Sequence, residues 1–177
     1  ARAKNQLEAK NIIKPIKDEL QKEFSKFIFG ENDDNLSSIL IKELLKRKQS
    51  LVFAESCTGG LLSSYITSIE GSSKVFKGSI ISYSNELKQS LLNIPANLIK
   101  KYGAVSEEVA ETMAINAKEK LNSDWSIAIS GIAGPSGGSK TKPIGLVHIA
   151  IAGPNNQITN IKKIFGKTRN RIEIQRL

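Results

Sequence analysis

The sequence contains few of the side chains that most often bind metals or form cross-links. Its 177 residues include one Cys, Cys57, and one His, His148. A lone Cys permits no internal disulfide, and one Cys with one His cannot supply the four ligands of a typical zinc site. The sequence therefore gives no support for a metal or other cofactor, and it predicts a location in the cytoplasm rather than export.

Long apolar runs are missing as well. No stretch approaches the roughly 20 apolar residues that a membrane helix needs, so we expect no membrane association. The chain begins Ala-Arg-Ala-Lys, without an initiating Met or an apolar secretory segment, which indicates a piece of a longer chain. A composition of 40% hydrophobic and 24% charged residues is typical of a globular domain.

Acidic residues are outnumbered, and the formal net charge is +9. The excess is concentrated at the C-terminus, because residues 161–177 hold six basic side chains and one acidic one, whereas residues 51–160 hold nine and eight. A protein built to track a polyanion carries its charge along its binding surface. The nearly neutral centre therefore argues against nucleic acid as a partner. The basic end, which includes Lys167 and Arg169, suits either a small anionic ligand or a solvated face.

Hydrophobic patterns predict that strands and helices alternate after residue 35. The expected strands cover residues 51–54, 78–82, 125–129, 146–152 and 158–165. The expected helices cover residues 36–46, 59–68 and 106–121, with a short helix after Asn85 and another from about Thr168. The last two strands form a hairpin around Gly-Pro-Asn-Asn. This order predicts a three-layer α/β/α domain with a mixed sheet over residues 36–177.

Residues 1–35 have a different pattern and predict a short α+β connector. A helical pattern covers residues 3–24, with a break or a second start at Pro15. A short strand is expected at residues 26–29. The polar run that follows is typical of a domain boundary.

Residues 54–60, Ala-Glu-Ser-Cys-Thr-Gly-Gly, join an apolar run to an amphipathic helix pattern. A strand, a tight turn and a helix in that order place the Ser56 hydroxyl at the carboxyl end of a strand, beside the N–H groups of a helix N-terminus. Open α/β sheets bind ligands at this position. Ser56 is therefore the leading candidate nucleophile. We expect Cys57 to be a small packed side chain rather than a nucleophile.

A second polar cluster, residues 83–88 (Tyr-Ser-Asn-Glu-Leu-Lys), also follows an apolar run. Neighbouring strand ends would bring Tyr83 and Lys88 close to Ser56. A serine nucleophile needs a base, and the pattern around His148 favours a structural role. Lys88 with a lowered pKa, acting directly or through the phenol of Tyr83, is the available substitute. On spacing alone, the simpler interpretation is a packed Tyr83 and a solvated Lys88.

Residues 130–138 form a glycine-rich run after a strand pattern, and its N–H groups could cradle a phosphate or carboxylate. The run lacks the Lys-Ser/Thr ending of a Walker loop and the spacing of a dinucleotide fingerprint. An ordinary turn is therefore an equally simple interpretation. Residues 71–73, Gly-Ser-Ser, form a further polar turn that helix capping explains.

Five motifs follow one another along the chain. They are residues 54–60, residues 83–86, residues 103–107 (Gly-Ala-Val-Ser-Glu), residues 130–135 (Ser-Gly-Ile-Ala-Gly-Pro), and the later Gly-Gly, Lys-Pro and Gly of residues 137–145. In this order they resemble the C-terminal domain of the CinA, or competence/damage-inducible, family, whose members include bacterial nicotinamide mononucleotide amidohydrolases. The resemblance covers residues 36–177. Residues 27–31 resemble the connector of two-domain CinA proteins, which implies a parent chain with a further N-terminal domain.

The resemblance implies hydrolysis of the carboxamide of nicotinamide mononucleotide to nicotinate mononucleotide and ammonia, without a metal. It implies that Ser56 is the nucleophile and that Tyr83 and Lys88 activate it. Other positions implied to bind substrate are Thr58, Gly59, Gly60, Ser73, Ser130, Gly131 and Gly134. Arg169 corresponds to a basic residue that would bind the phosphate, although the segment before it is one residue longer than in most family members. We expect a homodimer whose partner is this small-molecule nucleotide.

The alternative is a non-catalytic nucleotide-binding module that regulates the rest of a two-domain CinA protein. Such a module would bind a pyridine nucleotide without turnover. DNA association is a further alternative, which the nearly neutral centre argues against. The presence of Ser56, Tyr83 and Lys88 together favours the enzyme, because a binding module has no need of an activated serine.

Overall fold

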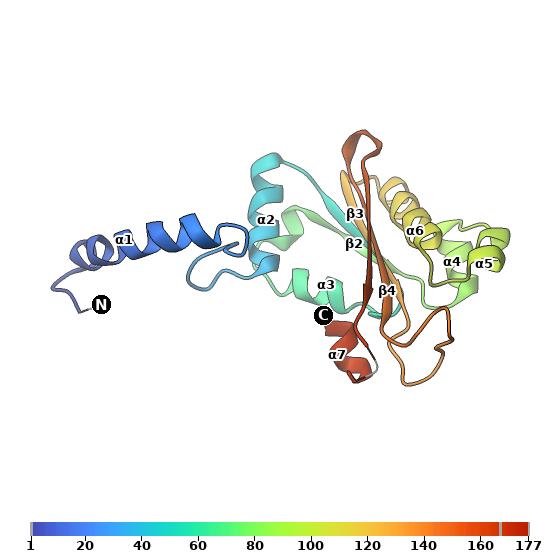
Figure 1. Ribbon diagram of the computed structural model, residues 1–177. Helices are drawn as coiled ribbons and strands as arrows, with labels where there is room; N and C mark the ends of the chain where they lie inside the picture. Colours follow the sequence, from blue (N-terminus) through green and yellow to red (C-terminus); the bar gives the residue numbers. More distant parts are fainter. Residues whose placement is uncertain (1, 167, 177) are drawn as a thin grey trace. The chain divides into compact units, whose positions relative to one another are not determined.

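The computed structural model of the protein describes residues 2–166 and 168–176. Lys167, one residue of the basic C-terminal segment, lies outside them. The chain divides into two compact units, Ala1–Leu40 and Ile41–Leu177. The larger unit is built on a mixed five-stranded sheet with helices on both faces (Figure 1). This arrangement confirms the predicted fold class.

The regular elements of the larger unit follow the expected order with small changes in length. The strands are β1 (Leu51–Glu55), β2 (Phe76–Ile81), β3 (Trp125–Gly131), β4 (Leu146–Ala152) and β5 (Ile158–Ile164). The helices are α3 (Leu61–Thr67), α4 (Asn85–Leu92), α5 (Ala96–Tyr102), α6 (Glu107–Lys120) and α7 (Arg171–Arg176), together with residues 41–47 of α2 (Leu36–Arg47). Short 3₁₀ turns cover Ser72–Lys74 and Pro154–Asn156.

The strand order, β2-β1-β3-β4-β5, determines where the polar turns meet. β1 pairs in parallel with β2 and β3, so the carboxyl ends of these three strands lie at one edge of the sheet. β4 and β5 are antiparallel, and their register places the start of β4 and the end of β5 at that same edge. The segments after β1, β2, β3 and β5 therefore converge there.

α6 covers one face of the sheet and is held by small side chains. Val109, Ala110, Met113, Ala114 and Ala117 point inward and are at most 1% exposed. They pack against alanines of β1, β3 and β4, which lets the helix approach the sheet closely. The hydroxyl of Ser126 on β3 also donates to the carbonyl of Ala114, at 2.5 Å.

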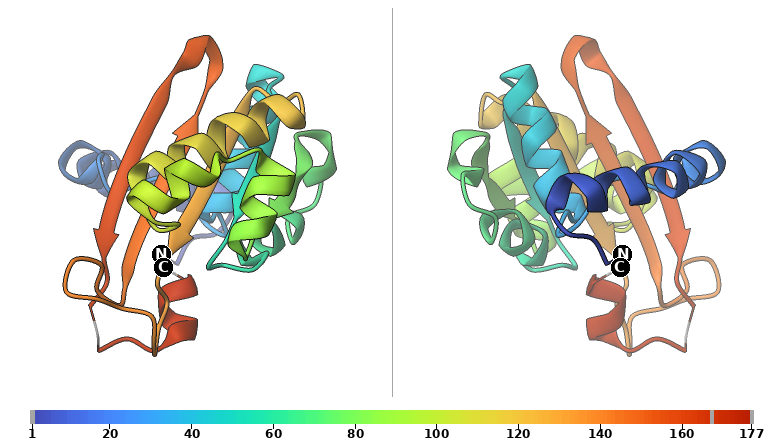
Figure 2. Two further views of the ribbon diagram at one scale, coloured as in Figure 1. Left: turned by 90° about the vertical axis from the view of Figure 1, so that its right-hand side faces the viewer. Right: turned by 90° about the vertical axis from the view of Figure 1, so that its left-hand side faces the viewer.

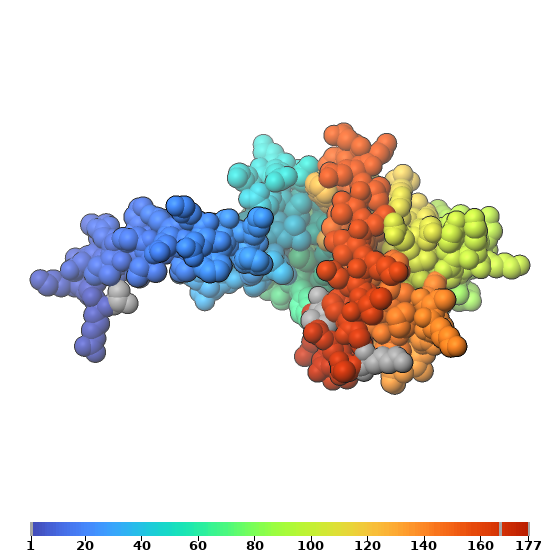
Figure 3. Space-filling model, viewed as in Figure 1, coloured from blue at the N-terminus to red at the C-terminus, as the bar shows by residue number. Residues whose placement is uncertain are grey.

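The two faces of the sheet carry different helices. α4, α5 and α6 lie on one face, and α3 with residues 41–47 of α2 lies on the other (Figures 1 and 2). β1 is buried along its whole length because strands flank it on both sides and α6 and α3 contact it. β5 is an exposed edge strand, and Figure 3 shows it running across the surface.

The smaller unit differs from its prediction. α1 (Gln6–Phe24) is one continuous helix with Pro15 inside it, begun by the side chain of Asn5, which accepts from the Glu8 N–H at 2.9 Å. The predicted strand at residues 26–29 was wrong, since those residues are in turn and irregular structure. The N–H groups of Phe27 and Ile28 both bond back to the carbonyl of Phe24, so this segment pairs with no strand.

α5 was missed in the larger unit because it is only seven residues long and begins directly after Pro95. It ends at Gly103, which has a φ of 75°. Within the described residues, none of the helices combines the length and the apolar character needed to cross a membrane.

Replacing Met113 with Ala should lower the free energy of unfolding by about 2–5 kcal/mol, because it leaves a cavity between α6 and the sheet. Glu119→Ala on the exposed side of the same helix is the matched control, with an expected change within about 0.5 kcal/mol. Urea denaturation of the two variants measures both values. Equal effects would contradict the packing of α6 described here.

Candidate active site

The turn after β1 is organised by the carboxylate of Glu55, which is fully buried. Its oxygens accept the N–H groups of Gly60 (3.0 Å), Leu62 (3.1 Å) and Ser63 (2.9 Å). These are the first N–H groups of α3, which a helix leaves without internal partners. Glu55 therefore fixes the start of α3 and, in doing so, occupies the N–H of Gly60, which the sequence predicted for substrate.

Ser56 follows Glu55 and is 8% exposed. Its N–H donates to the carbonyl of Ile129 at 3.0 Å, which continues the pairing of β1 with β3. The Ser56 hydroxyl lies 2.9 Å from the amine nitrogen of Lys88. The structure thus brings together two of the residues proposed from sequence, 32 positions apart.

Lys88 is 1% exposed, on the buried side of α4. The helix is capped by Ser84, whose hydroxyl accepts the N–H of Leu87 at 3.2 Å. The Lys88 amine also donates to the carbonyl of Ser82 at 2.6 Å. Within residues 2–166 and 168–176, no carboxylate pairs with it. This burial without a compensating anion lowers the pKa of Lys88, opposed only by the nearby thiol of Cys57.

The geometry suits a neutral lysine that acts as a base. A neutral amine retains two N–H donors and one lone pair. One donor reaches the carbonyl of Ser82, and the lone pair is then available to accept the proton of the Ser56 hydroxyl. An ammonium group would have no acceptor pair to offer.

Tyr83 lies at the mouth of the same site but does not bridge the other two residues. It is 57% exposed, and its phenol oxygen accepts a hydrogen bond from Arg171 at 2.6 Å. In the described part of the chain, this phenol forms no hydrogen bond with Ser56 or Lys88. The direct contact between Lys88 and Ser56 makes such a bridge unnecessary.

These residues line a cavity of about 250 Å³ at the carboxyl edge of the sheet. Ser56, Tyr83, Lys88, Ser130, Gly131 and Gly134, all predicted from sequence, line it together with Cys57, Ala104, Val105 and Arg171. Gly131 is required for close packing, because a side chain there would meet the carbonyl oxygen of Leu146 at 2.9 Å and the sulfur of Cys57 at 3.1 Å. The hydroxyl of Ser130 donates to the carbonyl of Ala104 at 2.7 Å.

Other predicted positions lie outside the lining of this cavity. Ser73 is exposed in the 3₁₀ turn Ser72–Lys74. The N–H of Gly59 donates to the carbonyl of Ser56 at 3.1 Å, and that of Gly60 donates to Glu55. The hydroxyl of Thr58 is buried and has no hydrogen-bond partner among the described residues.

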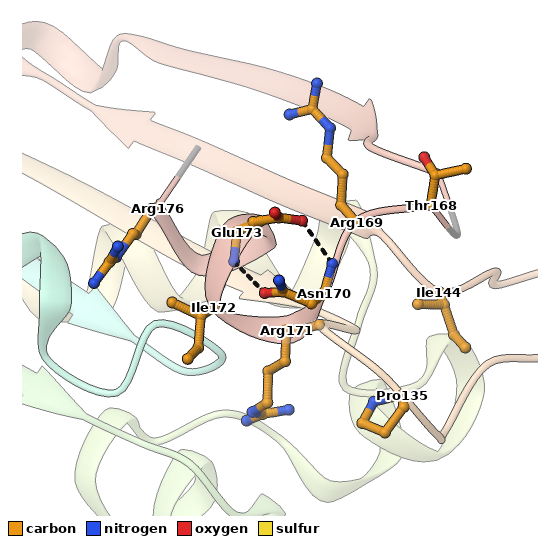
Figure 4. Close-up of a pocket in the computed structure, with 10 residues that line it drawn as sticks. Pro135, Ile144, Thr168, Arg169, Asn170, Arg171, Ile172, Glu173 and Arg176 are labelled. Atoms are coloured by element: carbon orange, nitrogen blue, oxygen red, sulfur yellow. Dashed lines mark hydrogen bonds between the residues drawn. The ribbon is translucent and has the colours of Figure 1, made fainter.

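Arg171 is the residue that sequence reasoning missed. One guanidinium nitrogen donates to the carbonyl of Gly134 at 3.0 Å and the other reaches Tyr83. Arg169, predicted for this place, lines a neighbouring pocket of about 870 Å³ that shares Ala133 and Arg171 with the Ser56 cavity. Figure 4 shows the side chains of Arg169 and Arg171 pointing in opposite directions.

The arrangement of α7 explains which arginine enters the site. Ile174 is 4% exposed and packs into an apolar cluster with Ala133 and Val147. On a helix, the residue three positions earlier shares its face, so burial of Ile174 turns Arg171 inward. In the sequence, this face of α7 is indicated by the apolar Ile174 with the polar Arg171 three positions before it.

Neither Cys57 nor His148 provides an alternative nucleophile or base. Burial raises the pKa of the Cys57 thiol to about 11, which keeps it protonated. His148 lies within β4 opposite Ser130, and burial, with Lys162 nearby, lowers its pKa. It is not part of the cavity lining.

The sequence model of the CinA C-terminal domain matches residues 33–177 of this chain. The chain belongs to the CinA family. A CinA-like protein of Prochlorococcus marinus subsp. pastoris is 84% identical over 177 residues, which is all of this chain and 41% of that protein. A CinA-like protein of Synechococcus sp. is 45% identical over 163 residues, covering 92% of this chain and 39% of that one. The chain therefore spans less than half the length of these CinA-like relatives.

Solved structures of the CinA family share the fold. A competence/damage-inducible protein of Agrobacterium tumefaciens matches with a TM-score of 0.78 and 34% identity, covering 84% of this chain and 89% of that one. A CinA superfamily protein of Escherichia coli matches with a TM-score of 0.76 and 31% identity, covering 84% and 87%.

The burial of Lys88 should appear in the pH dependence of stability. Its pKa in the folded protein lies below the value in the unfolded chain, about 10.4. Between these two values the unfolded chain binds more protons, so Lys88 adds stability as pH rises through the interval. The free energy of unfolding of the wild type, relative to Lys88→Met, should therefore increase as pH rises through the interval between the lowered pKa of the folded protein and about 10.4.

Urea denaturation at several pH values measures this difference, and Lys120→Met, at an exposed position, is the control. The control should show no such pH-dependent difference. A flat difference between wild type and Lys88→Met would contradict a lowered pKa.

Proposed function

We propose that this domain is an amidohydrolase that converts nicotinamide mononucleotide to nicotinate mononucleotide and ammonia through an acyl-enzyme on Ser56. The observation that carries the proposal is the buried amine of Lys88, 2.9 Å from the Ser56 hydroxyl and without a carboxylate partner in the described residues. Burying a lysine amine costs free energy of folding, and buried ionisable groups of this kind cluster at functional sites. Membership of the CinA family is compatible with this activity.

In the first step, the neutral amine of Lys88 takes the proton of Ser56 as the oxygen attacks the carboxamide carbon. The carbonyl oxygen then carries a negative charge. The N–H of Thr58, in the turn that follows the nucleophile, is a candidate donor to this oxyanion. The ammonium of Lys88 returns its proton to the amide nitrogen, which leaves as ammonia.

In the second step, water attacks the acyl group on Ser56, and Lys88 accepts the proton of that water. The serine oxygen leaves with a proton from Lys88, which releases nicotinate mononucleotide and returns the amine to its starting state. The same base thus serves both halves of the reaction, and every proton that it takes is returned.

Arg171 is our candidate for the phosphate of the substrate. Its guanidinium is held at the mouth of the cavity by Gly134 and Tyr83, and an arginine binds phosphate by paired hydrogen bonds. Tyr83 then orients Arg171, in place of the activation of Ser56 predicted from sequence. Arg169 stays a second candidate, since its pocket adjoins this cavity.

The predicted cytoplasmic location and homodimer accompany this proposal as expectations from the sequence. The alternative function, a nucleotide-binding module without catalysis, differs in one measurable respect. It requires binding of the nucleotide with no ammonia released by the wild type.

Ser56→Ala should reduce ammonia release from nicotinamide mononucleotide by roughly 1,000-fold or more, because no other group in the site can form the acyl-enzyme. Calorimetric titration should show that nucleotide binding survives in this variant. Ser68→Ala, on the exposed surface after α3, is the matched control and should keep wild-type turnover. Undiminished turnover in Ser56→Ala would end the nucleophile assignment, and binding without turnover in the wild type would support the module instead.

Arg171→Ala should raise the KM for nicotinamide mononucleotide about 10- to 100-fold through loss of charge-assisted hydrogen bonds, with a smaller change for nicotinamide riboside, which has no phosphate. Arg169→Ala is the matched comparison, and we expect less than about a threefold rise. Steady-state kinetics on both substrates distinguishes the two arginines. A larger effect at Arg169 would reverse the assignment.

A further inference from the structure

The helix α7 contacts the segments around the active site at several points. Ile174 is buried among Ala133, Val147 and their neighbours. Arg171 donates to Gly134 and Tyr83. The side-chain amide of Gln175 donates to the carbonyl oxygen of Cys57 at 2.7 Å, across 118 positions of sequence.

The hydrogen bond from Gln175 acts on a peptide group beside the nucleophile. The carbonyl of Cys57 and the N–H of Thr58 belong to one planar unit. A side chain that holds the oxygen therefore also fixes the direction of the N–H at the other end. It also polarises the peptide, because hydrogen bonds in a chain strengthen one another.

Most other N–H groups of this turn have partners. Those of Ser56, Gly59 and Gly60 donate to Ile129, Ser56 and Glu55 respectively. Within the described residues, the N–H groups of Cys57 and Thr58 donate no hydrogen bond to another backbone or side-chain group. Of these two, the N–H of Thr58 belongs to the peptide group whose carbonyl oxygen Gln175 holds.

We infer that Gln175 is a positioning residue, which aims the N–H of Thr58 at the oxyanion formed when Ser56 attacks the substrate. The inference rests on the proposed acyl transfer at Ser56. It makes the C-terminal helix part of the catalytic apparatus as well as part of the fold. Among the described residues, Gln175 forms no hydrogen bond with Ser56 or Lys88.

Two substitutions of Gln175 distinguish a positioning role from a packing role. Gln175→Leu keeps an apolar stem of similar size but cannot donate, whereas Gln175→Lys keeps a donor. Loss of one oxyanion donor costs about 100- to 1,000-fold in kcat. Misdirecting a donor should cost less, so we expect about a tenfold fall in kcat for Gln175→Leu, with KM within about twofold. Gln175→Lys should recover most of the lost kcat.

Gln157→Leu, at an exposed position in the turn between β4 and β5, is the matched control and should leave kcat unchanged. A packing role predicts the opposite pattern, in which Leu is tolerated and Lys is damaging. Wild-type kcat in Gln175→Leu, or equal losses in Gln175→Leu and Gln175→Lys, would overturn the inference.

A second assay keeps this test separate from the proposed substrate. Acylation of Ser56 by p-nitrophenyl acetate passes through the same kind of oxyanion, and release of p-nitrophenol measures its rate. If the wild type is acylated but releases no ammonia from nicotinamide mononucleotide, the proposed function fails, and slower acylation of Gln175→Leu still supports the inference. If the wild type is not acylated at Ser56, the inference fails as well.

Discussion

The site depends on one contact, in which a lysine amine is buried against a serine hydroxyl. Removing Lys88 from water penalises its charged form, and the described residues supply no carboxylate to compensate. What the fold supplies is the carbonyl of Ser82, which fixes the amine without neutralising a charge. Burial thus favours the neutral amine, whose lone pair can accept the proton of Ser56, in a chain whose single histidine lies elsewhere.

The sheet topology explains how such a site is assembled from distant parts of the chain. Three parallel strands deliver Ser56, the segment from Ser82 to Lys88 and the glycine-rich loop to one edge. The antiparallel pair β4 and β5 then returns the chain to that edge, so that α7 can contribute Arg171 and Gln175. Glu55 holds the turn below the nucleophile by occupying the first N–H groups of α3. The resulting site draws its groups from backbone and side chains of segments that are far apart in the sequence.

Sequence reasoning predicted the parts of the site that lie directly after strands. Ser56 and Lys88 follow two apolar runs that pair in parallel, so their proximity follows from local patterns and one rule of sheet construction. The place of Arg171 in the site could not be predicted from such local patterns. Its direction depends on the burial of Ile174, which is a tertiary contact of a six-residue helix. The role of Gln175 could not be predicted either, because its partner is a backbone carbonyl far away in sequence.

The errors in the smaller unit also have a physical origin. Residues 26–29 have the aromatic and β-branched composition of a strand, but a strand forms only when another strand satisfies its N–H and C=O groups. In the described residues no strand pairs with this segment, and it forms a turn after α1 instead. Pro15 removes one donor from α1, and the helix nevertheless continues through it.

The ionisation of Lys88 is the central claim, and side-chain NMR tests it directly. The signals of the Lys88 side chain, assigned by their loss in Lys88→Arg, can be followed as a function of pH in the otherwise unmodified protein. We predict a midpoint below the ordinary lysine pKa of about 10.4. A midpoint at or above that value would contradict it, because Lys88 would then be an ammonium group with no lone pair for Ser56.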